Sequence, residues 1–331
     1  MYSQFVGIDI SAENAQVEIR RAEQTVQQVC TDYTPAGLQL LCQILDQTEP
    51  ERGCTLVVME ATGVYWMKLA THLHEAGYVV SVINPAQAHY FARALLQRSK
   101  TDGLDAHTLA LLATKLQPAA WQPASPTLEA VYQRLRQREA LQATIQQQRN
   151  RRHACLRRPV RVQPVLDRID AHIAFLQAQI ADLDAELKHV IAADPAWQQA
   201  AQLLRSVKGF GPVATHWLLT ASRLLTACSS PEQLASYAGL VPRLFESGSS
   251  IHARPALGFA SHDRLRQALF MASLSAVQHN PIIRTFYLRL LERGKPKKVA
   301  LCACARKLIH IAWAVLFKQL PFNPSFQPLH P

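Results

Sequence analysis

Four acidic residues are spaced so that they could bind divalent metal ions. Asp9 lies in the apolar run 5–10 and Glu60 ends the run 55–60, and neither run is polar enough to face water on both sides. Asp102 and Asp105 are three residues apart, which puts both carboxylates on one face of a helix. Four carboxylates balance the charge of two Mg²⁺ ions and leave positions for phosphate oxygens. The pattern predicts metal-assisted chemistry on phosphate esters.

The pair Asp102 and Asp105 also has a simpler interpretation. An Asp N-cap followed three residues later by an acid is a common helix start, because both carboxylates interact favourably with the free backbone N–H groups of the first turn. The two interpretations are compatible. Without a metal, four clustered acids would repel each other and some would hold protons at neutral pH.

The elements that would position these acids alternate between strands and helices. Three β-rich runs near residues 4–10, 15–20 and 25–33 are joined by polar turns and predict an antiparallel meander. A helix at 35–47, a strand at 54–60, a helix at 64–76, a strand at 79–83 and two helices up to Gln117 follow. This order is that of a ribonuclease-H-like α/β fold, in which the central strand and its neighbour carry acids side by side.

A linker at residues 118–127 contains Pro118, Pro123 and Pro126, which cannot continue a helix. The next helix, 128–158, is rich in Gln, Ala and Arg. A second helix carries apolar residues at alternating spacings of four and three, which predicts a coiled-coil stripe: Val165, Ile169, Ile173, Leu176, Ile180, Leu183, Leu187 and Val190. Its partner could be the preceding helix or the same helix of another subunit, and a plain core helix is a further alternative.

Basic residues dominate the middle and the C-terminal part of the chain. Lys and Arg against Asp and Glu number 7 against 12 in residues 1–110, 12 against 8 in 111–199, and 16 against 4 in 200–331. Nine arginines lie between Arg134 and Arg161 with Glu139 as the only acid, and we expect phosphate contacts there, Arg151, Arg152, Arg157 and Arg158 included. A basic surface of this size favours nucleic acid. A generally solvated basic surface is the alternative, and an anionic membrane is a weaker one.

The turn Lys208-Gly209-Phe210-Gly211 stands between two helical patterns and resembles a helix-hairpin-helix. Such a turn lets backbone amides and a helix N-terminus approach a phosphate. A glycine turn between two core helices explains the same residues equally well.

Cysteine usage and hydropathy narrow the class of protein. The seven cysteines include no CxxC pair and mostly lie in apolar surroundings, which predicts reduced core residues and argues against a zinc site. The N-terminus begins directly with a strand, and the apolar stretch 301–317 is interrupted by Arg306, Lys307 and His310. We expect a cytoplasmic protein that does not enter a membrane.

Several motifs occur together, in order, over nearly the whole chain. They are Gly7-Ile8-Asp9, Met59-Glu60-Ala61-Thr62-Gly63, Val82-Ile83-Asn84-Pro85, Lys100-Thr101-Asp102-Gly103-Leu104-Asp105-Ala106 and Ala238-Gly239-Leu240-Val241-Pro242-Arg243 with Glu246-Ser247-Gly248. In this set the chain resembles the DEDD transposases of the insertion-sequence-one-hundred-and-ten family, relatives of Piv-type DNA invertases.

The resemblance implies an architecture and a chemistry. The implied domains are a RuvC-like catalytic domain (1–117), a linker with a coiled coil (118–194) and a mostly helical transposase domain (195–331). Asp9, Glu60, Asp102 and Asp105 become the metal-binding tetrad for Mg²⁺, and Ser247 becomes a nucleophile that links covalently to a DNA phosphate. The implied partners are donor and target DNA, a noncoding bridge RNA and further subunits in a dimer or tetramer. Sequence pattern alone would assign Ser247 to a flexible loop.

Two positions depart from the family pattern. Phe259 stands where a lysine is common, and His107 stands where the family often has arginine. Neither departure removes a tetrad acid or Ser247, so the predicted effect falls on nucleic-acid contacts near Phe259. Further candidate phosphate contacts are a group made of Arg243, Arg254, Arg264 and Arg266 and a run made of Arg293, Lys295, Lys297, Lys298, Arg306 and Lys307.

Two other functions are compatible with parts of the pattern. A hydrolytic nuclease of the junction-resolvase kind would use the tetrad with water as the nucleophile. A noncatalytic nucleic-acid-binding scaffold would use the acids only to cap helices and satisfy buried donors.

Overall fold

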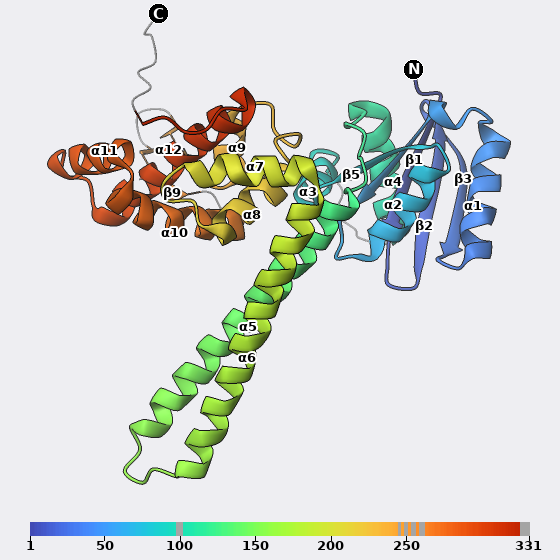
Figure 1. The fold of residues 1–331 in the computed structure, drawn as a ribbon. Coiled ribbons are helices and arrows are strands. Elements are labelled where there is room, and N and C mark those ends of the chain that lie inside the picture. The colour runs from blue at the N-terminus through green and yellow to red at the C-terminus, as the bar shows by residue number, and fades with distance from the viewer. Residues whose placement is uncertain (97–101, 244–245, 248–250, 253–255, 258–261, 325–331) are drawn as a thin grey trace, which may run out of the picture. The chain divides into compact units, whose positions relative to one another are not determined.

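The computed structural model describes residues 1–96, 102–243, 246–247, 251–252, 256–257 and 262–324. The side chains of Asp102, Arg243 and the short strands at 246–247, 251–252 and 256–257 lie outside that description. The chain divides into two compact units, Met1–Ala124 and Ser125–Pro331. Figure 1 shows the elements of each unit.

The first unit is built on a mixed five-stranded sheet. Its strands are β1 (Gln4–Ile10), β2 (Asn14–Arg21), β3 (Gln24–Asp32), β4 (Thr55–Glu60) and β5 (Val79–Ile83), in the order β3-β2-β1-β4-β5. The first three strands form an antiparallel meander, and β4 and β5 join β1 in parallel. The strands lie where the sequence predicts them.

Helices cover both faces of this sheet. On one face, α1 (Pro35–Thr48) and α2 (Tyr65–Glu75) pack on an apolar cluster that includes Ile8, Val17 and Met59. On the other face, α3 (Pro85–Ala94) and α4 (Asp102–Leu116) pack on a second cluster that includes Phe5 and Val58. Thr34 and Asn84 cap α1 and α3 by accepting hydrogen bonds from backbone amides of the first turn. A 3₁₀ turn at Arg52–Cys54 leads into β4.

The proline-containing segment after α4 packs on the first unit. The Ser81 hydroxyl donates to the carbonyl of Ala119 at 2.9 Å, and the amide of Trp121 donates to the carbonyl of Val80 at 2.7 Å. The Trp121 ring meets the Trp66 ring edge-on. These contacts explain why the boundary between the units falls after Ala124.

The second unit begins with a long antiparallel hairpin of α5 (Pro126–Leu156) and α6 (Gln163–Ala193) (Figure 1). Helix α6, which carries the predicted stripe, packs along the preceding helix of the same chain. Ion pairs join the helices along their length, from Arg134 with Glu186 at the base to Arg152 with Asp170 near the tip. Residues that the sequence assigns to phosphate thus serve partly to hold the hairpin.

The remaining helices form one core at the base of the hairpin. They are α7 (Pro195–Ser206), α8 (Pro212–Ser222), α9 (Pro231–Tyr237), α10 (Asp263–His279), α11 (Pro281–Glu292) and α12 (Lys297–Lys318). Among the described residues α12 alone is long and apolar enough to cross a membrane, but its residues Leu308 and Ile309 are fully buried in this core. Between α9 and α10, strands β6 (Pro242–Arg243), β7 (Glu246–Ser247), β8 (Ile251–His252) and β9 (Ala256–Leu257) pair as β6–β9 and β7–β8.

Candidate functional site

Two of the predicted acids end neighbouring parallel strands. Ile8 of β1 stands opposite Met59 of β4, so Asp9 and Glu60 are the next residues on the two strands. Because side chains alternate along a strand, Asp9 lies on the same face of the sheet as Phe5, and Glu60 lies on the same face as Val58. Both belong to the face that α4 covers. Both acids are half-buried. Their carboxylates therefore come from adjacent positions at one end of one face of the sheet.

Helix α4 brings a third acid to the same face. Leu109 and Leu112 belong to the apolar cluster between α4 and the sheet, and Asp105 lies four residues before Leu109 on the same side of the helix. The helix approaches β1 very closely at Gly7, where an added Cβ would stand 2.2 Å from the carbonyl oxygen of Ala106. Only glycine allows this approach, and the approach sets how near Asp105 comes to the strand ends.

The donor set of these acids fits a hard cation. Asp9, Glu60 and Asp105 contribute carboxylate oxygens, the ligands that Mg²⁺ prefers. Among the side chains that the structure describes, no three His, Cys, Asp or Glu residues lie close enough together to form a preassembled metal site. Asp102, the fourth acid, begins α4, but its side chain lies outside the described part. The structure therefore brings three acids to one end of one face of the sheet.

Tyr33 lies within electrostatic reach of this acidic end. Burial raises the pKa of Tyr33, and the negative charge of Asp9 raises it further. Its hydroxyl donates to the backbone carbonyls of Ser11 and Asn14, which follow β1 and begin β2. These bonds hold the loop next to Asp9 in place.

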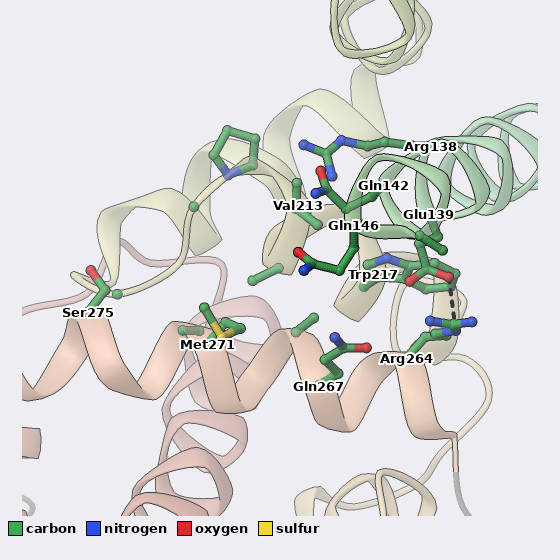
Figure 2. A pocket seen from close by; sticks show the side chains of 17 residues that line it. Arg138, Glu139, Gln142, Gln146, Val213, Trp217, Arg264, Gln267, Met271 and Ser275 are labelled. Atoms are coloured by element: carbon green, nitrogen blue, oxygen red, sulfur yellow. Dashed lines mark ion pairs between the residues drawn. The ribbon is translucent and has the colours of Figure 1, made fainter. Parts of the chain in front are cut away.

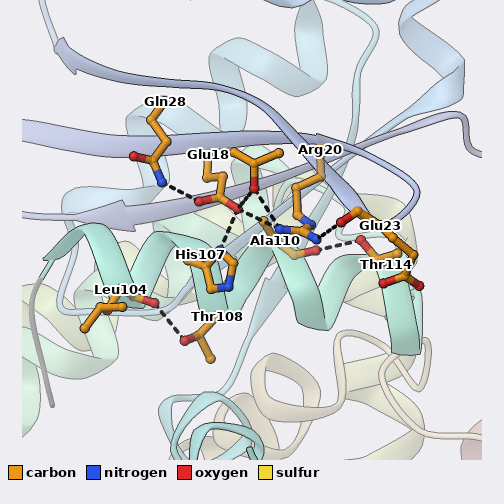
Figure 3. A network of polar contacts seen from close by, with 10 residues as sticks. Glu18, Arg20, Glu23, Gln28, Leu104, His107, Thr108, Ala110 and Thr114 are labelled. Atoms are coloured by element: carbon orange, nitrogen blue, oxygen red, sulfur yellow. Dashed lines mark hydrogen bonds and ion pairs between the residues drawn. The ribbon is translucent and has the colours of Figure 1, made fainter.

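A buried polar network fastens α4 to the sheet beside the acids (Figure 3). Glu18 stands opposite Gly7 in the β1–β2 pairing and is fully buried. Its Oε1 lies 2.8 Å from Nδ1 of His107 on α4 and accepts a hydrogen bond from Arg20 at 3.1 Å. Gln28 donates to Oε2 at 2.6 Å.

Glu18 is held as a carboxylate in this network. Burial alone would raise its pKa, but hydrogen bonds from Gln28, His107, Arg20 and Thr25 together lower it. The network was not anticipated from the sequence. A signal was present, since Glu18 and Arg20 occupy one face of a strand whose other face carries Ala15, Val17 and Ile19.

The predicted nucleophile lies in the other unit. Ser247 belongs to β7, opposite Ile251 of β8, and its side chain lies outside the described part. Arg243 is in β6, also without a described side chain. Arg254 and Phe259 lie outside the described residues.

The predicted helix-hairpin-helix turn joins α7 to α8. Gly209 has φ +119°, and an added Cβ there would stand 2.6 Å from the Cβ of Ala276 on α10, so packing explains this glycine. Gly211 caps α8 with open space around it. The carbonyl of Lys208 accepts a hydrogen bond from Nδ2 of Asn280 at 3.2 Å, while its side chain is exposed.

Gly211 opens into a cavity of about 630 Å³ at the base of the hairpin (Figure 2). Gln142 and Gln146 of α5 face Gln267 and Met271 of α10 across it. Glu139 also lines the cavity and pairs with Nε of Arg264 at 3.0 Å. Burial raises the pKa of Glu139, and the positive charges of Arg264, Arg136 and Arg138 oppose that shift.

The predicted basic contacts divide into two groups. Arg151, Arg157 and Arg158 are exposed at the tip of the hairpin, and Lys297 and Lys298 are exposed at the start of α12. Arg152 instead pairs with Asp170, with Nε 2.6 Å from Oδ1.

Comparison with known proteins agrees with this architecture. Residues 6–159 match a transposase family of the DEDD type found in IS110 elements, and residues 201–288 match the transposase IS116/IS110/IS902 family. The chain is 32% identical over 324 residues to the pilin gene-inverting protein of Moraxella bovis, covering 98% of each protein. It is 34% identical over 268 residues to the protein of that name from Moraxella lacunata, covering 81% of each. It is 23% identical over 298 residues to the transposase of insertion element IS1328 from Yersinia enterocolitica, covering 82% of this chain and 86% of that protein. The chain thus belongs to the IS110 family of transposases and DNA-inverting proteins.

Proposed function

We propose that this transposase cuts and rejoins DNA strands with Mg²⁺ at Asp9, Glu60, Asp102 and Asp105 and with Ser247 as a covalent nucleophile. The observation that supports the metal site best is the adjacent placement of Asp9 and Glu60 under the face of α4 that carries Asp105. The strand order β3-β2-β1-β4-β5, an antiparallel meander followed by parallel strands, supports a RuvC-like fold for this unit.

Each group has a separate part in the proposed reaction. The Ser247 oxygen bonds to phosphorus as one phosphorus–oxygen bond of the DNA breaks, so the hydroxyl proton is lost and the leaving DNA oxygen gains one. Rejoining reverses these changes with a different DNA oxygen, so no nucleotide cofactor is needed. Bound Mg²⁺, expected as two ions, would stabilise charge on the attacking and leaving oxygens. The four carboxylates would hold the ions in place, and Gly7 allows α4 to lie close to β1.

The chain's substrates and partners follow from its relatives and its charge. Relatives named as pilin gene-inverting proteins and as a transposase support donor and target DNA as substrates. The basic middle and C-terminal parts support a guide RNA, because protein can hold a nucleic-acid backbone while base pairing selects the sequence. We further propose that the protein acts in the cytoplasm as a dimer or tetramer.

One experiment separates this mechanism from its two alternatives. Purified protein is incubated with RNA copurified from its host, substrate DNA and Mg²⁺, and protein–DNA adducts are resolved on denaturing gels. We expect an adduct that Ser247→Ala abolishes and the neighbouring Ser249→Ala retains. Free DNA ends at full rate in Ser247→Ala would establish the hydrolytic nuclease instead. The noncatalytic scaffold would be established if the protein bound DNA without cleaving it, and if this binding were the same with and without Mg²⁺ and the same in Asp9→Asn.

A further inference from the structure

Two cations from different helices meet at one aromatic ring in the second unit. The guanidinium carbon of Arg289 on α11 lies 5.4 Å from the ring centre of Phe286, and Nζ of Lys307 on α12 lies 4.9 Å from the same centre. Both distances fall inside the ~6 Å range of a cation–π contact. The ring thus holds two positive charges near each other.

These groups line a cavity of about 400 Å³ whose remaining walls are Pro281, Ile282, Thr285 and Pro324. Among the residues that the structure describes, no acidic side chain lines this cavity. Arg289 is exposed and Lys307 is half-buried, so the donors of both remain accessible from the cavity. A volume of this size lies within the ~300–1,000 Å³ of ordinary ligand pockets.

The surroundings leave this positive charge unbalanced. Residues 281–307 contain eight Lys or Arg and a single acid, Glu292. Within the described part of the chain, none of those eight cations forms an ion pair. Two like charges directed at one ring repel each other, and the negative face of the ring offsets this only in part. An anion between them would remove the repulsion.

We propose that Arg289 and Lys307 form a binding site for a backbone phosphate of nucleic acid, DNA or RNA, with Phe286 holding both cations in position. The planar fork of Arg289 matches two phosphate oxygens, and Lys307 supplies a point charge. The exposed cations Arg293 and Lys295 lie on the turn from α11 to α12, and the exposed Lys297 and Lys298 begin α12, so the positive charge continues along the chain beyond Arg289. That extension selects a polyanion over a small free anion.

The segment that matches the family ends at residue 288, so Phe286 lies within it and both cations lie beyond it. The site is independent of the acids of the first unit and of Ser247, and it is tested by binding in EDTA, where strand cleavage plays no part.

The test compares two charge-matched double variants of the full chain. Arg289→Gln/Lys307→Gln removes the cations of the cavity, and Arg293→Gln/Lys295→Gln removes two cations of the same basic run outside it. Binding of fluorescein-labelled single-stranded RNA, single-stranded DNA and duplex DNA of one length and sequence is measured by fluorescence polarisation over a range of KCl concentrations. We expect the cavity variant to bind at least one probe roughly 10- to 100-fold more weakly, with a salt slope smaller by about one to two. The matched control should lose less than about fivefold.

The outcomes distinguish the source of the phosphate and the failure of the proposal. A loss confined to RNA or to DNA identifies the bound nucleic acid, and an equal loss on all probes identifies backbone contact alone. Equal weakening by both double variants would overturn the site, because it would show only diffuse attraction. Unchanged binding by the cavity variant would overturn it as well. Arg289→Lys/Lys307→Arg retains both charges and should restore most of the affinity, which excludes loss by misfolding.

Discussion

The buried pair of Glu18 and Arg20 allows a quantitative test of how α4 is fixed to the sheet. Their side chains are 1% and 5% exposed, and Glu18 Oε1 lies 3.1 Å from the guanidinium. Glu18→Leu leaves the charge of Arg20 buried without its carboxylate, and it removes the partner of His107 on α4. Breaking one member of a buried ion pair costs about 3–5 kcal/mol. We expect that loss in the stability of the first unit.

The assay is native-state hydrogen exchange of the full chain, read by mass spectrometry on peptides from β1, β2 and α4. A loss of about 3–5 kcal/mol corresponds to exchange that is faster by roughly two to four orders of magnitude in these elements. Peptides from α7 to α12 belong to the other unit and serve as the internal control, because their exchange should not change.

The double variant Glu18→Leu/Arg20→Leu supplies the decisive comparison. Replacing both members of a buried pair by apolar residues is often neutral or stabilising, so most of the protection should return. If the double variant exchanges as fast as Glu18→Leu, the cost does not come from the stranded charge and the reasoning is wrong. A single-variant loss below about 1 kcal/mol would also refute it, since that is the range of an exposed pair.

The remaining predictions concern pH and close packing. Because folding lowers the pKa of Glu18, its carboxylate stabilises the folded first unit above pH 4.5, the unfolded pKa, and this stabilisation is lost as the pH falls through the folded pKa. Glu18→Gln should lack this pH-dependent part of the stability in an acid titration followed by tryptophan fluorescence. Gly7→Ala should destabilise the first unit by about 1–3 kcal/mol and weaken Mg²⁺ binding measured calorimetrically, whereas Gly53→Ala, with no atom within 4 Å of the new Cβ, should do neither. Gly209→Ala should lower the free energy of unfolding of the second unit, because its φ is positive and Ala276 blocks the Cβ, while Gly211→Ala should change that free energy by no more than about 0.5 kcal/mol, as measured by thermal denaturation. Equal effects in either glycine pair would contradict the packing argument.

Local sequence pattern was enough to place the strand acids. Asp9 and Glu60 end apolar runs, and the parallel pairing that brings such ends together follows from the alternation of strands and helices. The partner of α6 was not predictable, because the same stripe suits a helix of this chain or of another. Contacts between distant residues were also beyond the sequence, as His107 and Glu18 are 89 positions apart.

Charge and composition carried less information in the C-terminal part. The basic run was visible, but the meeting of Arg289 and Lys307 at Phe286 depends on how α11 packs on α12. In the same way, a count of arginines in α5 could not distinguish Arg152, which pairs with Asp170, from its exposed neighbour Arg151. Ser247 had no local signal at all, since a serine beside a glycine is ordinary loop sequence, and only the resemblance drew attention to it.

A small rotation at the base of the α5–α6 hairpin produces a larger displacement at its tip. Its base is anchored by Val131 and Leu135 of α5 and by Leu187 and Ile191 of α6, which belong to the core of the second unit. Beyond Leu135, helix α5 continues for 21 residues to Leu156, so roughly 32 Å of helix extends from that anchor. A tilt of about 10° at the base would move the tip by about 5.5 Å. Packing at four apolar side chains therefore decides where the arginines at the far end can reach.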